Sequence, residues 1–217
     1  MATAPQYANP NYWNTRYSTN KEAYDWYQDW SALKELVTPH IQENDRILHI
    51  GCGTSKIPAD MLAEGYTAQT CIDQCEALIE ELKEQYGEES PIQFEAKSVA
   101  EMELPEDPFP VVFEKAVLDS VFCSARPTAA VHELLSQIYG LLAYEGRYIS
   151  VSYAAPEQRL KHFEAFAWQT EVYEVPKPLL STTVSATKEE PSGMHYVYVC
   201  VKPPAPEPSE VSEEAKD

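Results

Sequence analysis

Short apolar runs alternate with amphipathic stretches through most of this chain, and this alternation constrains the fold more than any other feature of the sequence. Compact apolar runs are typical of buried strands, and apolar residues at helical spacing are typical of helices that cover a sheet. The expected strands are 46–50, 70–73, 92–94, 111–113, 147–153, 168–175 and 194–201. The expected helices between them are 57–63, 75–86, 131–142 and 156–166. Strands that alternate with helices predict a mostly parallel α/β sheet with helices on both faces.

The two ends of this pattern differ from its middle. Leu33, Leu36 and Val37 continue at helical spacing until Pro39, which predicts a helix ahead of the sheet. The last two apolar runs flank a polar insertion at 176–193. They are therefore predicted to pair as an antiparallel hairpin at one sheet edge.

A length of 217 residues favours one domain with a sizeable core. We place it at 12–202. Residues 1–11, with two prolines and few aliphatic residues, are predicted to be a flexible leader, and the proline-rich, glutamate-rich stretch 203–217 a disordered acidic tail. The first residues lack the basic patch and apolar run of a secretory signal peptide, and no apolar stretch has the length of a membrane span. We expect a cytoplasmic monomer with no membrane contact.

Charge and cysteine content restrict the partners. Lys and Arg number 16 against 35 Asp and Glu, which gives a net charge of -19 and argues against nucleic acid as a partner. The same charge suits a cationic partner, although acidity is also a common aid to solubility. The five cysteines form no C-x-x-C pair, and the five histidines show no ligand spacing, so we expect reduced thiols and no metal site.

A glycine turn follows the first predicted strand. Gly51 and Gly53 can adopt backbone angles that other residues avoid, and they allow a ligand to approach the main chain. Asp73 ends the second strand, where a carboxylate can accept hydrogen bonds from ribose hydroxyls. Because the third glycine of the dinucleotide fingerprint is absent, a phosphate-free nucleoside cofactor such as S-adenosylmethionine fits this turn better than NAD. A glycine turn with a purely conformational role is the alternative.

Several ordered motifs together resemble the methyltransferases that modify lysines of eukaryotic elongation factor 1A. These motifs are residues 12–17, 24–27, 50–53, 114–119, 146–150, 154–156 and 196–200. The resemblance extends from about residue 12 to 202. It implies a Rossmann-like, seven-stranded class I methyltransferase sheet, S-adenosylmethionine as cofactor, and lysine methylation of elongation factor 1A as the activity.

The resemblance also implies roles for individual residues. Residues 12–39 form an aromatic segment that covers the cofactor, with contacts from Trp13, Tyr17 and Trp26. The other implied cofactor contacts are Gly51, Gly53, Asp73, Gln74, Ser98, Val99 and Lys115. The motif after the fourth strand is associated with activity and implies Glu114, Lys115 and Asp119 as catalytic residues.

Ordinary structural roles stand beside these functional ones. The aromatic residues can simply pack a helix on the sheet, Lys115 can extend to solvent, and Asp119 can cap the following helix. The chain also departs from the family pattern. Ser98 replaces an acid that holds the adenine, Ala116 and Val117 replace Gly and Thr in the activity motif, and Thr54 replaces an Asn. A small-molecule methyltransferase and a binding module that has lost catalysis therefore remain as alternatives.

Overall fold

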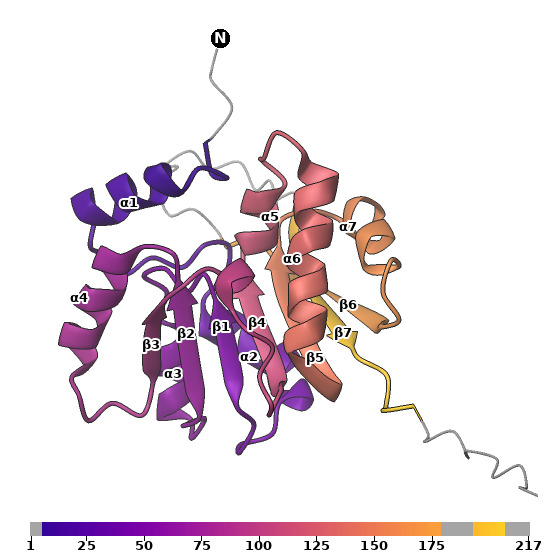
Figure 1. The fold of residues 1–217 in the computed structure, drawn as a ribbon, viewed down its shortest axis with the longest axis horizontal. Coiled ribbons are helices and arrows are strands. Elements are labelled where there is room, and N and C mark those ends of the chain that lie inside the picture. Colours follow the sequence, from indigo (N-terminus) through magenta and orange to yellow (C-terminus); the bar gives the residue numbers. More distant parts are fainter. Residues whose placement is uncertain (1–5, 179–192, 207–217) are drawn as a thin grey trace, which may run out of the picture.

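A computed structural model describes residues 6–178 and 193–206 (Figure 1). Seven strands form one sheet in the order β3-β2-β1-β4-β5-β7-β6. Their bounds are β1 Ile47–Ile50, β2 Gln69–Asp73, β3 Gln93–Ala96, β4 Phe109–Lys115, β5 Leu142–Ser152, β6 Gln169–Pro176 and β7 Met194–Val201. The first five strands are parallel, whereas β7 runs antiparallel to both β5 and β6. The predicted fold class and the edge hairpin are confirmed.

Helices cover both faces of the sheet (Figure 1). Their bounds are α1 Pro10–Thr19, α2 Trp30–Val37, α3 Ile57–Ala63, α4 Glu76–Tyr86, α5 Val117–Val121, α6 Pro127–Leu141 and α7 Pro156–Phe163, with 3-10 turns η1 Thr38–His40 and η2 Val99–Glu101. α6 and α7 pack on one face through a cluster that includes Leu135 and Tyr148, and α2 and α3 pack on the other through Leu33 and Met61. None of the helices in the described ranges is long and apolar enough to cross a bilayer.

Helix α4 shows why the sequence pattern predicts its element well. Leu78, Ile79 and Leu82 recur at helical spacing and are buried against Cys71 and Phe94 of β2 and β3. The glutamates of α4 lie on its opposite, mostly exposed side. An apolar stripe of this width drives a helix onto a sheet, so the helix and its orientation follow from local sequence.

Several elements differ from the predictions; β5, for example, begins at Leu142 and not at 147. The predicted leader is too long, because α1 begins at Pro10 and is capped by the Asn9 side chain. Helix α5 was not predicted, since its five residues are too few to show a period. Helix α6 begins four residues before the predicted Val131, at Pro127, a residue suited to a first helical turn. Most of the polar insertion (179–192) and most of the acidic tail (207–217) lie outside the described residues.

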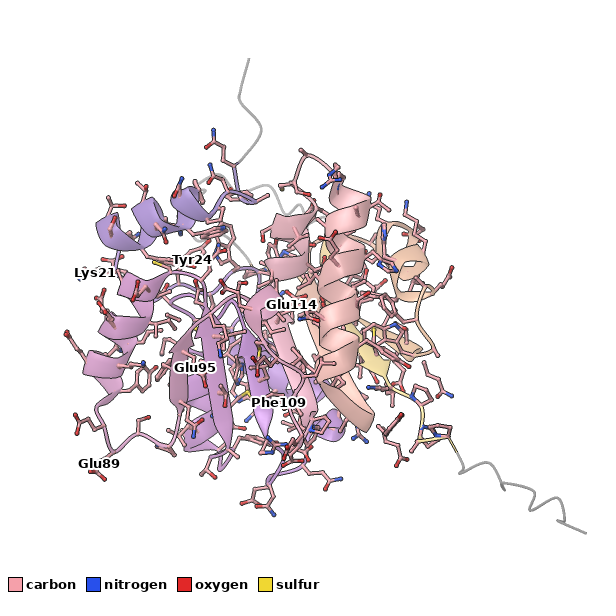
Figure 2. The ribbon with its side chains drawn as sticks, in the orientation of Figure 1. Lys21, Tyr24, Glu89, Glu95, Phe109 and Glu114 are labelled. Atoms are coloured by element: carbon pink, nitrogen blue, oxygen red, sulfur yellow. The ribbon has the colours of Figure 1, made fainter. Side chains whose placement is uncertain are left out.

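The carboxyl ends of the five parallel strands meet at one edge of the sheet, and the loops that follow them meet there as well. In Figure 2 the start of β4 at Phe109 lies near the bottom and its end at Glu114 lies higher, so this edge is the upper one. Helix α1 and the segment that follows it, with Tyr24, lie above this edge (Figures 1 and 2).

Candidate active site

The glycine turn between β1 and α3 adopts the backbone conformation predicted for it. Gly51 and Gly53 have φ values of 58° and 53°, in the left-handed region that favours glycine. A Cβ atom on Gly51 would lie 2.4 Å from Cγ2 of Val117, and one on Gly53 would lie 2.6 Å from the hydroxyl of Tyr17. Both glycines are therefore required by conformation and by close packing against the elements above them.

Asp73 ends β2 and turns its carboxylate toward this glycine turn. Its two oxygens accept hydrogen bonds from the backbone N–H groups of Gly53 (3.1 Å) and Cys75 (3.0 Å). Burial raises the pKa of Asp73, and these backbone donors oppose the shift. A carboxylate has about four lone-pair positions, so capacity remains for further donors from a ligand.

The aromatic residues of the N-terminal segment form one contiguous cluster over the upper edge. Trp13 stacks on Tyr17 (ring centroids 5.8 Å apart) and meets Trp26 edge to face (6.1 Å). The indole N–H of Trp13 also donates to the backbone carbonyl of Tyr7 (2.7 Å), so the cluster reaches into the segment predicted to be a leader. We call residues 7–28 the aromatic lid.

Asp25 fastens this lid to the sheet, a role that sequence reasoning missed. Its carboxylate accepts hydrogen bonds from the Lys115 ammonium (3.0 Å), from the backbone N–H of Lys56 (3.3 Å) and from the hydroxyl of Ser55. Lys115 also donates to the backbone carbonyl of Trp26 (2.9 Å). Burial lowers the pKa of Lys115, and the charge of Asp25 opposes that shift. Lys115 is thus buried in an ion pair that holds the lid on the sheet, and its side chain does not extend to solvent.

Glu114, at the end of β4, is buried beside the cavity and fully hydrogen-bonded. One carboxylate oxygen accepts from the backbone N–H groups of Val117 (2.8 Å) and Leu118 (3.3 Å), and the other accepts from the hydroxyls of Tyr148 (3.2 Å) and Ser150. Burial raises the pKa of Glu114 to about 7 despite these donors. The side chain holds the start of α5 against β5.

Asp119 does not line the cavity with the other predicted residues. Its carboxylate pairs with Arg159 (2.6 Å) and also accepts from the Ser152 hydroxyl (2.6 Å) and the Tyr153 backbone N–H (3.1 Å). These bonds tie α5 to the end of β5 and to α7, and both charged side chains are buried. The alternative interpretation of Asp119 as a cap of the following helix is also wrong, because Asp119 lies within α5 and Arg126 occupies the cap position of the next helix, α6.

Ser98 and Val99 lie after β3 on the cavity wall. Ser98 is the N-cap of η2, where its hydroxyl accepts from the Glu101 backbone N–H and its own N–H donates to the Glu101 carboxylate (2.9 Å). The Ser98 side chain is therefore already committed to a capping box.

Beneath the aromatic lid lies a cavity of about 740 Å³. All ten residues predicted to contact the cofactor line it: Trp13, Tyr17, Trp26, Gly51, Gly53, Asp73, Gln74, Ser98, Val99 and Lys115. Of the two other predicted catalytic residues, Glu114 lines the cavity and Asp119 does not. A volume of this size is in the range of small-molecule sites, and the mix of aromatic walls with a few polar groups is typical of them. The cavity has the room, the carboxylate and the stacking faces that a nucleoside such as S-adenosylmethionine requires.

Comparison with known proteins agrees with this geometry. A solved structure of a 1,6-didemethyltoxoflavin-N1-methyltransferase from Burkholderia thailandensis, with bound S-adenosylhomocysteine, is similar over 94% of this chain and 92% of that one, with a TM-score of 0.68. At 16% identity this likeness shows the fold alone. Residues 48–150 match the sequence profile of a family described as "Methyltransferase domain". The chain therefore has a methyltransferase-like fold, and residues 48–150 resemble a methyltransferase domain in sequence.

The domain also has curated sequence relatives. EEF1A lysine methyltransferase 4 of Mus musculus is 28% identical over 168 residues, which is 73% of this chain and 66% of that protein, just under two thirds of its length. The eEF1A lysine and N-terminal methyltransferase of Mus musculus is 26% identical over 180 residues, or 80% of this chain and 26% of that protein. The predicted resemblance to elongation factor 1A methyltransferases is confirmed.

Proposed function

We propose that this chain is a cytoplasmic, monomeric methyltransferase that uses S-adenosylmethionine to methylate a lysine of translation elongation factor 1A. The observation that carries the proposal is the cavity beneath the aromatic lid, lined by every residue that the family resemblance implies for the cofactor. The names of the curated relatives support the substrate, and the net charge of -19 suits a basic protein surface.

In this proposal, different cavity residues contact different parts of the cofactor. Asp73 accepts the ribose hydroxyls with the lone pairs that Gly53 and Cys75 leave free. Val99, after β3, contacts the adenine, and Gly51 and Gly53 border the methionine part. Trp13 and Trp26 cover the cofactor from above and exclude water.

S-adenosylmethionine, when bound, supplies an electrophilic methyl group on a positively charged sulfur. The contribution of the chain is then to align a lysine nitrogen with that methyl carbon at about 3 to 3.5 Å. A lysine amine must be neutral to attack, and its reference pKa of about 10.4 requires desolvation or a base. Glu114 already accepts from four internal donors, and Asp119 is paired with Arg159 away from the cavity lining, so desolvation beneath the aromatic lid is the proposed source of the neutral amine.

A labelled transfer assay tests the proposal. The full chain is incubated with recombinant elongation factor 1A and methyl-labelled S-adenosylmethionine, and methylated peptides are mapped by mass spectrometry. We expect label on lysine of the factor, and its loss when S-adenosylhomocysteine is added in excess. A chain that binds the cofactor yet labels no lysine would overturn the substrate assignment. Label that appears only on small molecules of a cell extract would favour the small-molecule alternative.

A further inference from the structure

Resting on the proposed function, we propose that Tyr24, Tyr27 and Tyr153 form the surface that receives the lysine-bearing, cationic segment of the protein substrate. The three rings are joined through Trp26 in one continuous row. Ring centroids lie 5.3 Å apart for Tyr24 and Trp26, 6.3 Å for Trp26 and Tyr27, and 6.1 Å for Tyr27 and Tyr153. We call these four residues the aromatic row.

The two ends of the aromatic row are open to solvent. Tyr24 is 49% exposed and Tyr153 is 51% exposed, although both rings pack edge to face on inner members of the row. Exposed aromatic rings connected to a cavity wall are typical of binding surfaces, because tyrosine offers a large contact area with little loss of side-chain freedom. Tyr24 lines the cavity, and Tyr153 lies at the outer end of the row.

The backbone that carries the aromatic row is strained. Tyr27 has a φ of 65°, and the backbone N–H of Gln28 donates to the carbonyl of Trp26 (2.7 Å), which makes Tyr27 the centre of a tight γ-turn. A bulky residue rarely adopts this conformation, which persists only where its surroundings hold it. Here the Gln28 amide donates to the carbonyl of Pro176 (2.7 Å) and contacts the His195 ring nitrogen (3.1 Å). The turn aims Trp26 into the cavity and Tyr27 away from it, toward Tyr153.

Two arginines of the chain itself lie beside the aromatic row, which shows that its ring faces can accept cationic groups. The Arg16 guanidinium lies 5.5 Å from the ring centroid of Tyr24 and 5.3 Å from that of Trp26, and Arg159 lies 5.9 Å from that of Tyr153. Burial and the neighbouring charge of Asp119 raise the pKa of Tyr27. Its hydroxyl therefore stays protonated and its side chain stays uncharged. Aromatic faces attract ammonium groups, and the net charge of -19 draws a cationic segment toward them.

The position of the aromatic row suits the acceptor. The cavity extends from Asp73 on β2 past Gly51 after β1 to Lys115 on β4. With the ribose on Asp73, the other end of the cofactor faces β4, and Tyr153 directly follows the neighbouring strand β5. Tyr24 and Trp26 of the row line the cavity, and Tyr27 and Tyr153 continue the row outward from it toward the end of β5.

Substitutions of Tyr153 test the proposal, with Tyr144 as a matched control. Tyr144 is 55% exposed and lies near the start of β5, whereas Tyr153 follows the end of the same strand, about 30 Å away. The readouts are calorimetric binding of recombinant elongation factor 1A to the full chain with S-adenosylhomocysteine present, and the KM for that factor. We expect Tyr153→Ala to weaken binding and raise KM about threefold to tenfold, with cofactor affinity unchanged.

Two further variants of Tyr153 test whether binding depends on the aromatic face or on the hydroxyl, and whether it responds to charge. Tyr153→Phe keeps the aromatic face and should behave as wild type, whereas Tyr153→Lys places a like charge on the surface and should bind more weakly than Tyr153→Ala. Tyr153→Ala that matches Tyr144→Ala, or Tyr153→Phe as impaired as Tyr153→Ala, would overturn the inference. Normal methylation of elongation factor 1A in those same variants would leave the proposed function standing, whereas a wild-type chain that neither binds nor labels the factor overturns both.

Discussion

Ala116 occupies the left-handed region of backbone space (φ 73°) between β4 and α5. The family that this chain resembles usually has glycine at this position. For an L-residue with a Cβ atom, the left-handed conformation costs about 1 to 2 kcal/mol. The resulting strain lies on the cavity wall, one residue from Lys115.

Replacing Ala116 with glycine relieves this strain. We expect Ala116→Gly to raise the free energy of unfolding by about 1 kcal/mol, part of the gain being offset by the greater backbone freedom of glycine in the unfolded chain. Urea denaturation measures the change. Ala77→Gly in helix α4 is the control and should lower stability by about 0.5 to 1 kcal/mol. A loss of stability in Ala116→Gly would contradict the assignment of strain.

Glu114 should make the free energy of unfolding fall as the pH rises, which is the opposite of the usual effect of a carboxylate. Burial raises the pKa of Glu114 to about 7 from an ordinary value of 4.5, so between these values the folded chain holds a proton that the unfolded chain has released. The contribution of Glu114 to the free energy of unfolding is therefore greatest below pH 4.5 and is lost as the pH rises through 7, by about 2 to 3 kcal/mol.

A difference measurement isolates this contribution from that of other groups. Urea denaturation of wild type and Glu114→Gln is compared from pH 4.5 to 7.5, since glutamine does not titrate. We expect the stability difference between the two proteins to change in that window in favour of Glu114→Gln as the pH rises. Parallel curves would show that Glu114 titrates near its ordinary pKa.

At the scale of elements, the aromatic lid depends on one buried ion pair. Only 5% of the Lys115 side chain and 13% of the Asp25 side chain are exposed, so the removal of one charge leaves the other buried without a partner. We expect Asp25→Asn to lower the free energy of unfolding by about 3 kcal/mol and to speed hydrogen exchange in α1.

Cofactor binding should weaken with the same substitution, because the aromatic lid forms the roof of the cavity. The matched control is Lys21→Gln, which removes the exposed pair of Lys21 with Glu81 and should change stability little. If the amides of α1 exchanged at the wild-type rate in Asp25→Asn, the ion pair of Asp25 would not hold the lid on the sheet.

The elements themselves were largely predictable, since apolar spacing is a local signal. The stripe of Leu78, Ile79 and Leu82 gave α4, and the runs that became β6 and β7 gave the edge hairpin. The contacts of the site were predictable only in part. Asp25 and Lys115 are 90 positions apart, and no local pattern reports such a pair. The partners of Asp119 were invisible for the same reason, because Arg159 meets it only in the folded chain.

At the scale of the whole molecule, a net charge of -19 should govern association with a basic substrate. Salt shortens the range of electrostatic attraction, from about 30 Å at 0.01 M to about 8 Å at 0.15 M. We expect kcat/KM for elongation factor 1A to fall severalfold when sodium chloride rises from 0.02 M to about 0.3 M, mainly through KM. Steady-state kinetics over a salt series measure this effect, and a flat or rising series would exclude charge as the source of substrate attraction.

The claim on which the account depends is that the cavity beneath the aromatic lid takes S-adenosylmethionine with its ribose on Asp73. Calorimetric titration of the full chain with S-adenosylmethionine tests it most directly, with Asp73→Asn beside the exposed control Glu89→Gln. We expect one binding site per chain. Affinity should be at least tenfold weaker in Asp73→Asn, since a hydrogen bond to a charged group contributes about 1.5 to 3 kcal/mol, and unchanged in Glu89→Gln. No heat of binding in the wild type, or equal affinity in all three proteins, would contradict this claim.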